Sequence, residues 1–256
     1  MAFEGTVALI TGAASGMGRL AAQNLAVQGA RVAALDVDES GLATTAEGHD
    51  GIVTFRADVT DFSSLEAIVK QVETDLGPID RVYNSAAIMP LGRLMEQDLG
   101  TIHKIMEINY GGVVNVTRAT LPGMLERGRG DMILFASMAG WIPTFYVGAY
   151  NASKFAVVAF SEVLREENRH RGVRFACVCP PPVATPLLKQ ARDSVWPKLF
   201  DEAPALDPQH VLDEIEKTLE RDAFWVFPGR GTALAQRMRR WIPKLLWKRI
   251  RRIEGL

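Results

Sequence analysis

The sequence predicts an α/β fold built on a doubly wound parallel sheet of about seven strands, with helices on both faces. Three observations predict it: apolar β-branched runs alternate with helix-like segments, a glycine-rich turn follows the first run, and the composition stays uniform before residue 230. Repeated strand-helix alternation implies parallel strands joined by right-handed crossovers. One domain over residues 1–230 therefore fits better than two, with a distinct tail at residues 231–256.

Seven short runs rich in apolar and β-branched residues are expected to be strands. They cover residues 6–11, 31–36, 52–57, 79–84, 132–136, 173–178 and 224–227. Between them, apolar residues recur with helical period near residues 17–28, 39–47, 62–75, 98–127, 152–170 and 208–220. In such sheets ligands bind beyond the carboxyl ends of the strands, so functional residues are expected there.

Composition is that of an ordinary globular protein. Of the 256 residues, 48% are hydrophobic and 23% are charged, the net charge is −1, and no apolar run is long enough to span a bilayer. The first residues lead into an apolar run without a basic segment, so we expect no secretory signal and a cytoplasmic location. Cys177 and Cys179 share one side of a predicted strand and are not expected to form a disulfide, and the four scattered histidines predict no metal site.

A glycine-rich turn follows the first predicted strand and leads directly into a helix. It reads Thr-Gly-Ala-Ala-Ser-Gly-Met-Gly over residues 11–18. Glycine permits a tight turn, close approach of the backbone to a pyrophosphate and close helix-sheet packing, and the helix N-terminus supplies amide donors. A plain βα turn fits the glycines alone equally well. As a dinucleotide site, the turn would use Gly12, Ser15, Gly16, Met17 and Gly18.

An acid ends the second predicted strand. Asp36 lies eighteen residues after Gly18, where a carboxylate can accept hydrogen bonds from the ribose hydroxyls of an adenosine. A carboxylate there would repel the 2′-phosphate of NADP, and neither Ser15 nor Val37 supplies a compensating positive charge. We therefore expect NAD rather than NADP.

Tyr150 and Lys154 are a candidate acid-base couple. Four residues along a helix bring two side chains onto one face, so a phenol and an ammonium could share a pocket. The ammonium and an oxidised nicotinamide, both positive, would lower the pKa of Tyr150 from its usual value of about 10. The spacing alone also fits a half-buried tyrosine beside a solvated lysine.

With these motifs the chain resembles the short-chain dehydrogenase/reductase family over nearly all of residues 5–228. Asp58 follows the third predicted strand, and Ser137 lies thirteen residues before Tyr150, which is the usual spacing in that family. The catalytic positions of the family match Asn109, Ser137, Tyr150 and Lys154. The resemblance implies a single-domain Rossmann-type fold, a nicotinamide cofactor, and a homodimer or homotetramer.

Two short motifs depart from the pattern of the family. It usually shows Asn-Asn-Ala-Gly where this chain has Asn-Ser-Ala-Ala, ending at Ala87, and Pro-Gly where this chain has Pro180 and Pro181. Ala87 carries a Cβ and Pro181 lacks an N–H, so both departures alter the backbone expected near the nicotinamide. Neither departure affects a catalytic side chain.

The resemblance implies a role for each matched residue. Tyr150 would take the proton of an alcohol, or return it to a ketone, while hydride passes between the carbinol carbon and the nicotinamide. Ser137 would hold the substrate oxygen, and Asn109 would hold a water that links Lys154 to solvent. Cofactor contacts are implied for Asp36, Asp58, Val59, Asn84, Tyr150, Lys154, Val183 and Thr185.

Bulky apolar residues near the catalytic positions and after Thr185 predict a hydrophobic substrate pocket. We expect a small hydrophobic secondary alcohol or ketone, lipid-like, steroid-like or aromatic. Several of these side chains could equally pack a lid against the core. The expected lining is Met138, Trp141, Phe145, Leu188 and Trp196, together with Ile142, Leu187, Val195, Leu199 and Phe200.

The tail has nine basic residues and one acid from Arg230 onward. It places Leu234, Met238, Trp241, Leu245, Leu246, Ile250 and Ile253 at helical spacing, and Pro243 is expected to break or restart the helix. A basic amphipathic helix with tryptophan is typical of peripheral membrane contact. Docking on a subunit and capping of the chain's own pocket stay open, whereas no nucleic-acid-reading motif accompanies the charge.

Two other functions stay open. One is a scaffold or redox sensor that binds NAD(H) without significant turnover, for which Ala87 and Pro181 are the best support. Retention of the four catalytic residues argues against it. The other is an NADPH-dependent keto-acyl reductase, which shares the fold but conflicts with Asp36.

Overall fold

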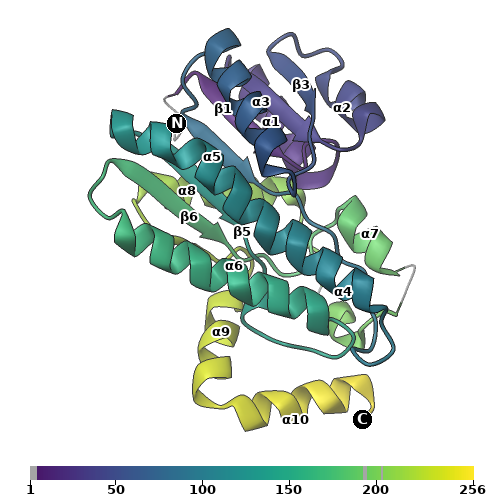
Figure 1. Cartoon of the computed structure of the whole chain (residues 1–256). Coiled ribbons are helices and arrows are strands. Elements are labelled where there is room, and N and C mark those ends of the chain that lie inside the picture. Colours follow the sequence, from purple (N-terminus) through teal and green to yellow (C-terminus); the bar gives the residue numbers. More distant parts are fainter. Residues whose placement is uncertain (1–4, 193–194, 203) are drawn as a thin grey trace.

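The computed structural model describes residues 5–192, 195–202 and 204–256. It contains one seven-stranded parallel sheet with the order β3-β2-β1-β4-β5-β6-β7 (Figure 1). The predicted α/β class and doubly wound topology are therefore confirmed. The strands are β1 (Val7–Thr11), β2 (Arg31–Asp36), β3 (Ile52–Arg56), β4 (Arg81–Asn84), β5 (Gly130–Phe135), β6 (Val173–Val178) and β7 (Trp225–Val226).

Helices cover both faces of the sheet. One face packs against α1 (Gly16–Val27), α2 (Glu39–Ala46) and α8 (Pro208–Glu220). The other packs against α3 (Phe62–Asp75), α5 (Gly112–Arg127) and α6 (Gly148–Glu167). Apolar side chains on both sides of each central strand are fully buried, as expected for a parallel sheet between two helical layers.

Several helix boundaries differ from those predicted. The long segment at residues 98–127 is divided into α4 (Leu99–Met106), a π-helical turn (Glu107–Gly111) and α5. Helix α6 begins at Gly148, earlier than predicted, so Tyr150 lies in its first turn. The structure also has a short helix α7 (Pro186–Arg192) and two 3₁₀ turns, Met138–Gly140 and Lys198–Asp201.

The tail forms two helices, α9 (Thr232–Trp241) and α10 (Pro243–Glu254), with Pro243 at the first position of the second. Proline is favoured there because its missing N–H would lack a helical partner anyway. In Figure 1 the two yellow helices form an L at one end of the molecule, near α4 and α6 and far from α2 and β3. Among the described residues, no helix combines the length and apolar character needed to cross a membrane.

The winding of the sheet reverses between β1 and β4. Strands β2 and β3 follow outward on one side of β1, and β4 to β7 follow on the other. A crevice forms at such a reversal beyond the carboxyl ends of the strands, because the connecting helices diverge to opposite faces there. The glycine turn after β1 and the residues after β4 lie at this point.

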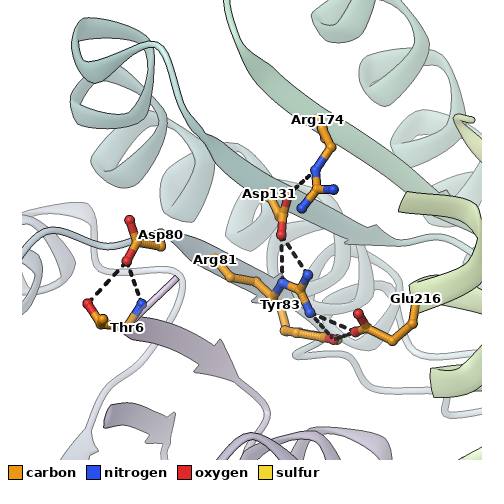
Figure 2. A network of polar contacts seen from close by, with 7 residues as sticks. All are labelled: Thr6, Asp80, Arg81, Tyr83, Asp131, Arg174 and Glu216. Atoms are coloured by element: carbon orange, nitrogen blue, oxygen red, sulfur yellow. Dashed lines mark hydrogen bonds and ion pairs between the residues drawn. The ribbon is translucent and has the colours of Figure 1, made fainter. Parts of the chain in front are cut away.

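A row of charged residues crosses the amino ends of β4, β5 and β6 (Figure 2). Arg81 is paired in register with Asp131, and Asp131 with Arg174. Both Arg81 Nε and Nη2 donate to Asp131 Oδ2, at 2.9 and 2.6 Å, while Arg174 Nε donates to the other oxygen at 2.6 Å. Arg81 Nη1 donates to Glu216 of α8 at 2.6 Å. The Arg81 side chain is completely buried, so these bonds replace its hydration.

Substitution of Arg81 by methionine should lower the free energy of unfolding by about 3–5 kcal/mol, because Asp131 and Glu216 would lose the partner that compensates their burial. Urea denaturation measures the change. The matched control is Arg56→Met, since Arg56 pairs with Glu39 at 3.4 Å but both side chains are largely exposed. The control should cost less than about 1 kcal/mol. Equal losses for the two variants would contradict the role assigned to Arg81.

Candidate active site

The glycine turn after β1 is packed too tightly to accept larger residues. A Cβ atom added to Gly18 would lie 2.2 Å from the carbonyl oxygen of Gly12, so only glycine lets the first turn of α1 approach the end of β1. Ser15 is the residue before α1, and its side chain makes no capping hydrogen bond. The first amides of α1 therefore remain available to an anion such as a pyrophosphate.

Asp36 lies beside this turn at the end of β2. Its Oδ2 accepts a hydrogen bond from Ala14 N at 3.0 Å, and its Oδ1 accepts one from Asp38 N at 3.1 Å. These bonds fix the carboxylate next to the turn and leave lone pairs for ribose hydroxyls. The nearby guanidinium of Arg19 donates through Nη2 to the carbonyl oxygens of Ala14 and Gly41 and through Nε to Thr45 Oγ1, so these two nitrogens are directed to the protein itself.

The other predicted cofactor residues on this side act partly as supports. Asp58 is exposed after β3 and accepts from the backbone N–H and the hydroxyl of Thr60. Asn84 is buried, and its Nδ2 donates to the carbonyl oxygen of Val113 at 3.0 Å, which ties β4 to α5. Val59 packs against Gly112 of the same helix. Asp58 and Val59 follow the carboxyl end of β3, whereas the Asn84 side chain supports the end of β4.

Ser85, which was not among the predicted site residues, also lines the cavity. Its backbone N–H donates to Thr11 Oγ1 at 3.1 Å and its hydroxyl donates to the carbonyl oxygen of Thr11, so it joins the ends of β1 and β4. The signal in the sequence is a polar residue directly after a buried strand. Ser85 occupies a position where the resembled family usually has asparagine.

Ser137, Tyr150 and Lys154 converge on one cavity of about 490 Å³. Ser137 follows β5, whereas Tyr150 and Lys154 lie one turn apart on α6. Tyr150 and Lys154 are almost completely buried, and the Lys154 Nζ lies 5.7 Å from the centre of the Tyr150 ring. The spacing of the motif therefore produces a shared pocket.

A glycine contact sets the relative position of Ser137 and the two residues on α6. The 3₁₀ turn Met138–Gly140 follows Ser137 directly and packs on α6. A Cβ atom added to Gly140 would lie 2.6 Å from the carbonyl oxygen of Lys154, so a larger residue would push the turn away from the helix. Ser137 Oγ accepts from Ala139 N at 3.0 Å, which holds the hydroxyl at the cavity wall.

The pKa of Tyr150 differs in direction from the sequence expectation. Burial raises the pKa of the phenol to about 12, and the hydrogen bond with Ser137 lowers it only in part. The attraction of Lys154 favours the phenolate, but the cost of removing a phenolate from water is the larger effect in a closed pocket. A positive group bound in the cavity would act against that cost.

The pKa of Lys154 is lowered to about 8, also because of burial, while the thiols of Cys177 and Cys179 act in the opposite direction. Lys154 Nζ donates to the carbonyl oxygen of Phe135 at 2.7 Å. An ammonium has three donors, and Lys154 also lines the cavity, so its remaining donors can reach a hydroxyl-bearing ligand. Cys177 and Cys179 are both free thiols, as predicted.

Asn109 lies in the π-helical turn between α4 and α5. Its Oδ1 accepts from Ile88 N at 2.8 Å, and its Nδ2 donates to Ile88 O and to Ser153 Oγ. Ser153 is the neighbour of Lys154, so Asn109 joins the loop after β4 to α6 beside Lys154. The Asn109 amide is fully buried, and its hydrogen bonds go to protein groups.

The loop after β6 brings the remaining predicted cofactor residues to the same place. Val183 forms a β-bridge with Leu206, and the hydroxyl of Thr185 donates to Val183 O at 3.3 Å. The side chain of Thr185 lies against Gly16 of the glycine turn. Both Val183 and Thr185 line the cavity, as do Ala87 and Pro181, where the chain departs from the resembled pattern.

The apolar lining of the cavity agrees only in part with the predicted pocket. Met138 and Leu188 line it, together with Ile142, Leu187, Leu199 and Phe200. Three predicted aromatic residues face elsewhere among the described residues. Trp141 packs edge-on against Trp225 and donates to Cys179 Sγ, and Trp196 packs on Phe200 and donates to Asp201.

Phe145, the third of these aromatic residues, packs on Trp247 of α10 at a centroid distance of 5.6 Å. The tail also contributes directly to the wall of the cavity, which the composition of the sequence could not show. Its residues on the cavity wall are Arg230, Gly231, Thr232, Ala235, Met238, Leu246, Arg249 and Ile250. Of the three interpretations of the tail, a cap over the chain's own pocket agrees with this lining.

Two contacts hold the tail in place over the cavity. Glu254 is buried near the end of α10, and its carboxylate accepts from the backbone N–H groups of Lys198 and Leu199 at 3.2 and 3.0 Å. Arg249 pairs with Glu202 at 3.5 Å at the rim. These contacts connect α10 to the 3₁₀ turn Lys198–Asp201, so the tail and that turn cover the cavity together.

The site fits a dinucleotide. The carboxylate of Asp36 at the end of β2, the uncapped amides of α1 after β1 and the ammonium of Lys154 at the end of β5 follow one another along the carboxyl edge of the sheet. No group of three histidine, cysteine or carboxylate side chains positioned to hold a metal ion occurs in the described part of the chain.

Comparison with known proteins gives one family. The sequence pattern described as short chain dehydrogenase matches residues 6–196. D-threitol dehydrogenase of Mycolicibacterium smegmatis is 38% identical over 194 residues, which cover 74% of this chain and 75% of that protein. Glycine betaine reductase ATRR of Emericella nidulans is 35% identical over 219 residues, which cover 83% of this chain but only 17% of that protein.

Two solved structures extend the likeness to the fold. A short-chain dehydrogenase/reductase from Burkholderia phymatum in complex with NAD has a TM-score of 0.85 and 26% identity, with 96% of each chain covered. Actinorhodin polyketide ketoreductase with NADPH has a TM-score of 0.82 and 28% identity, with 90% of this chain and 97% of that chain covered. The likeness thus includes proteins with either nicotinamide cofactor.

Proposed function

Because the chain belongs to the short-chain dehydrogenase/reductase family, whose members are NAD(P)-dependent oxidoreductases acting on CH–OH groups, we propose that it interconverts a hydrophobic secondary alcohol and its ketone with NAD. The observation that carries this proposal is the convergence of Ser137, Tyr150 and Lys154 on one apolar cavity. The cofactor accepts or supplies the hydride.

Each catalytic residue has one task in this proposal. Tyr150 takes the hydroxyl proton during oxidation and returns it to the carbonyl oxygen during reduction. Ser137 donates to the substrate oxygen and keeps it within reach of the phenol. Lys154 would hold the cofactor through a ribose hydroxyl, and it keeps a positive charge near Tyr150, which favours the phenolate. Asn109 positions α6 through Ser153.

The hydrophobic substrate class rests on the side chains around the catalytic group. Leucine, isoleucine, methionine and phenylalanine residues line the same cavity as Tyr150, and the tail contributes Met238, Leu246 and Ile250. Such a wall gains free energy when it covers apolar carbon, whereas a polyol would lose hydrogen bonds to water there. Charged groups occur at the rim, where Arg249 and Glu202 form an ion pair.

The preference for NAD rests on Asp36. Its carboxylate is fixed beside the glycine turn by Ala14 N, where the 2′-hydroxyl of the adenosine ribose would lie. A 2′-phosphate would bring a second negative charge to that place. Two arginines near this carboxylate already have protein partners: Arg19 donates to Ala14, Gly41 and Thr45, and Arg56, the register partner of Asp36 on β3, pairs with Glu39.

Tyr150→Phe should retain NADH binding and lose turnover by about a factor of 100 to 10,000, because the ring is kept and only the proton carrier is removed. The measurement is nicotinamide absorbance with NAD and a panel of hydrophobic secondary alcohols, and with NADH and the matching ketones. Tyr110→Phe is the matched control, since Tyr110 packs on Phe160 and does not line the cavity. Unchanged turnover in Tyr150→Phe would exclude the mechanism. Bound NADH without turnover of any panel member by the wild type would favour the scaffold.

The rate of oxidation should rise with pH. Burial raises the pKa of Tyr150 to about 12, so the phenol is largely protonated at neutral pH, and the reactive phenolate fraction grows about tenfold per pH unit below the pKa. Reduction needs the protonated phenol and should not rise. The measurement is kcat/KM in both directions between about pH 5 and 7, below the pKa of about 8 at which half of Lys154 has lost its proton. A rate of oxidation that falls over this range would contradict the assignment.

Asp36→Ala should improve the affinity for NADPH relative to NADH by about tenfold or more, because it removes the charge that repels a 2′-phosphate. Fluorescence titration with both cofactors measures the ratio. Asp50→Ala removes an exposed acid elsewhere on the surface and should leave the ratio unchanged. A wild-type protein that already binds NADPH more tightly would overturn the NAD preference and favour the keto-acyl reductase.

A further inference from the structure

The corner between α9 and α10 exposes a group of large apolar side chains. Trp241 is 76% exposed, Leu245 56% and Ile242 40%, and all three lie within five consecutive positions around the bend at Pro243. Leu234, two turns earlier on α9, is 61% exposed. Several large apolar side chains exposed next to one another are unusual on the surface of a soluble protein. They often mark a site that binds another protein, a ligand or a membrane.

These side chains are not the ones that cover the active site. The inner face of the tail uses Ala235 and Met238 from α9 and Leu246 and Ile250 from α10 to line the cavity. On α10 the neighbours Leu245 and Leu246 point in directions about 100° apart, so one can face the cavity while the other faces outward. The exposed apolar side chains of the corner are therefore not needed to pack the tail against the rest of the protein.

Cations surround the exposed apolar group. Arg237 and Arg240 lie on α9, and Lys244 and Lys248 lie on α10. Within the described part of the chain these four side chains form no ion pair. The only acid of the tail, Glu254, is buried against the backbone of Lys198 and Leu199, so it does not offset the outward charge.

We propose that this corner, defined by Leu234, Trp241, Ile242 and Leu245 with the surrounding cations, docks on a membrane surface that contains anionic lipids. Such a surface offers phosphate groups for the arginines and lysines and an apolar layer just beneath for tryptophan and leucine. A second copy of the chain fits less well, because a symmetric contact would bring two strongly positive tails together.

The tail would dock as part of the folded protein. Helix α10 is held to the body by Glu254, by the packing of Trp247 on Phe145, and by Ile250, which is buried. Binding through the outer face therefore needs no detachment of the helices from the cavity. In Figure 1 the L formed by α9 and α10 lies at one end of the molecule, where a flat surface can reach the corner.

Cosedimentation of the full chain with lipid vesicles tests the proposal, and it needs no catalytic activity. The probes are vesicles of phosphatidylcholine alone and vesicles with equal parts of phosphatidylcholine and phosphatidylglycerol. We expect binding to the anionic vesicles that weakens as salt is raised, and little binding to the neutral ones. Failure to sediment with anionic vesicles at low salt overturns the proposal.

Two variants with matched controls identify the surface. Trp241→Ser with Leu245→Ser removes the apolar part and should weaken binding at least about tenfold, whereas Val27→Ser, at a residue also 76% exposed but on α1, should have no effect. Lys244→Glu with Lys248→Glu should also weaken binding by about tenfold or more. Lys70→Glu on α3 is its control.

Two further measurements keep the outcome clear. NADH binding and circular dichroism of each variant should match the wild type, which shows that the fold is retained. Light scattering without lipid should give the same mass for the wild type and for Trp241→Ser with Leu245→Ser. A smaller mass for that variant would show that the corner is a contact between copies, and equal vesicle binding by all variants would place the lipid contact elsewhere. Either result overturns the proposal.

Discussion

The buried row Arg81–Asp131–Arg174 is the interaction on which the geometry of the site depends. These residues are directly paired across β4, β5 and β6, and Glu216 closes the row from α8 (Figure 2). Side chains alternate between the faces of a strand, so a slip by one residue would leave buried charges without partners. The cost of that state fixes the register of the three strands at their amino ends.

The register at the amino ends also holds at the carboxyl ends, because each of these strands is short and its pairing is unbroken along its length. Strand β4 ends at Asn84, β5 leads to Ser137, and β6 leads to the loop that carries Val183. The last step is made by packing: Gly140 lets the turn after Ser137 lie on α6, and Asn109 connects α6 to the loop after β4. Strands β4, β5 and β6 are thus held in position by the ion pairs at their amino ends and by close packing at their carboxyl ends.

Local signals in the sequence predict the fold and the convergence of the candidate catalytic residues, because neighbouring parallel strands place residues that are far apart in the sequence close together in space. Parallel strands bring every strand end to one edge, so the glycine turn, Asp36, Ser137 and the pair on α6 needed only their positions along the chain. The partners of Arg81 were not predictable in this way. They lie 50 and 135 residues away, and an arginine at the start of a strand gives no sign that it is buried.

Two features of the site depend on how completely the surrounding loops and the tail bury it, and local sequence patterns do not predict that burial. The raised pKa of Tyr150 comes from burial, and that burial requires the surrounding loops and tail to be in place. Likewise Trp141, Phe145 and Trp196 have the residue type expected of a pocket, yet each has an aromatic partner that draws it elsewhere, such as Trp225, Trp247 or Phe200. Residue type predicts burial better than it predicts direction.

The tail has apolar residues on two sides: one set lines the cavity, and the other is exposed to solvent. A helix that covers a core with one stripe needs polar residues elsewhere, and α10 meets that rule except at Leu245. Had the sequence used a lysine at that position and at Trp241, the cover of the cavity would be unchanged, since Leu246, Met238 and Ile250 provide it. Packing on the cavity therefore does not explain the exposed apolar residues of the tail. They lie among cations that form no ion pair in the described part of the chain, which favours a partner with both anionic and apolar groups.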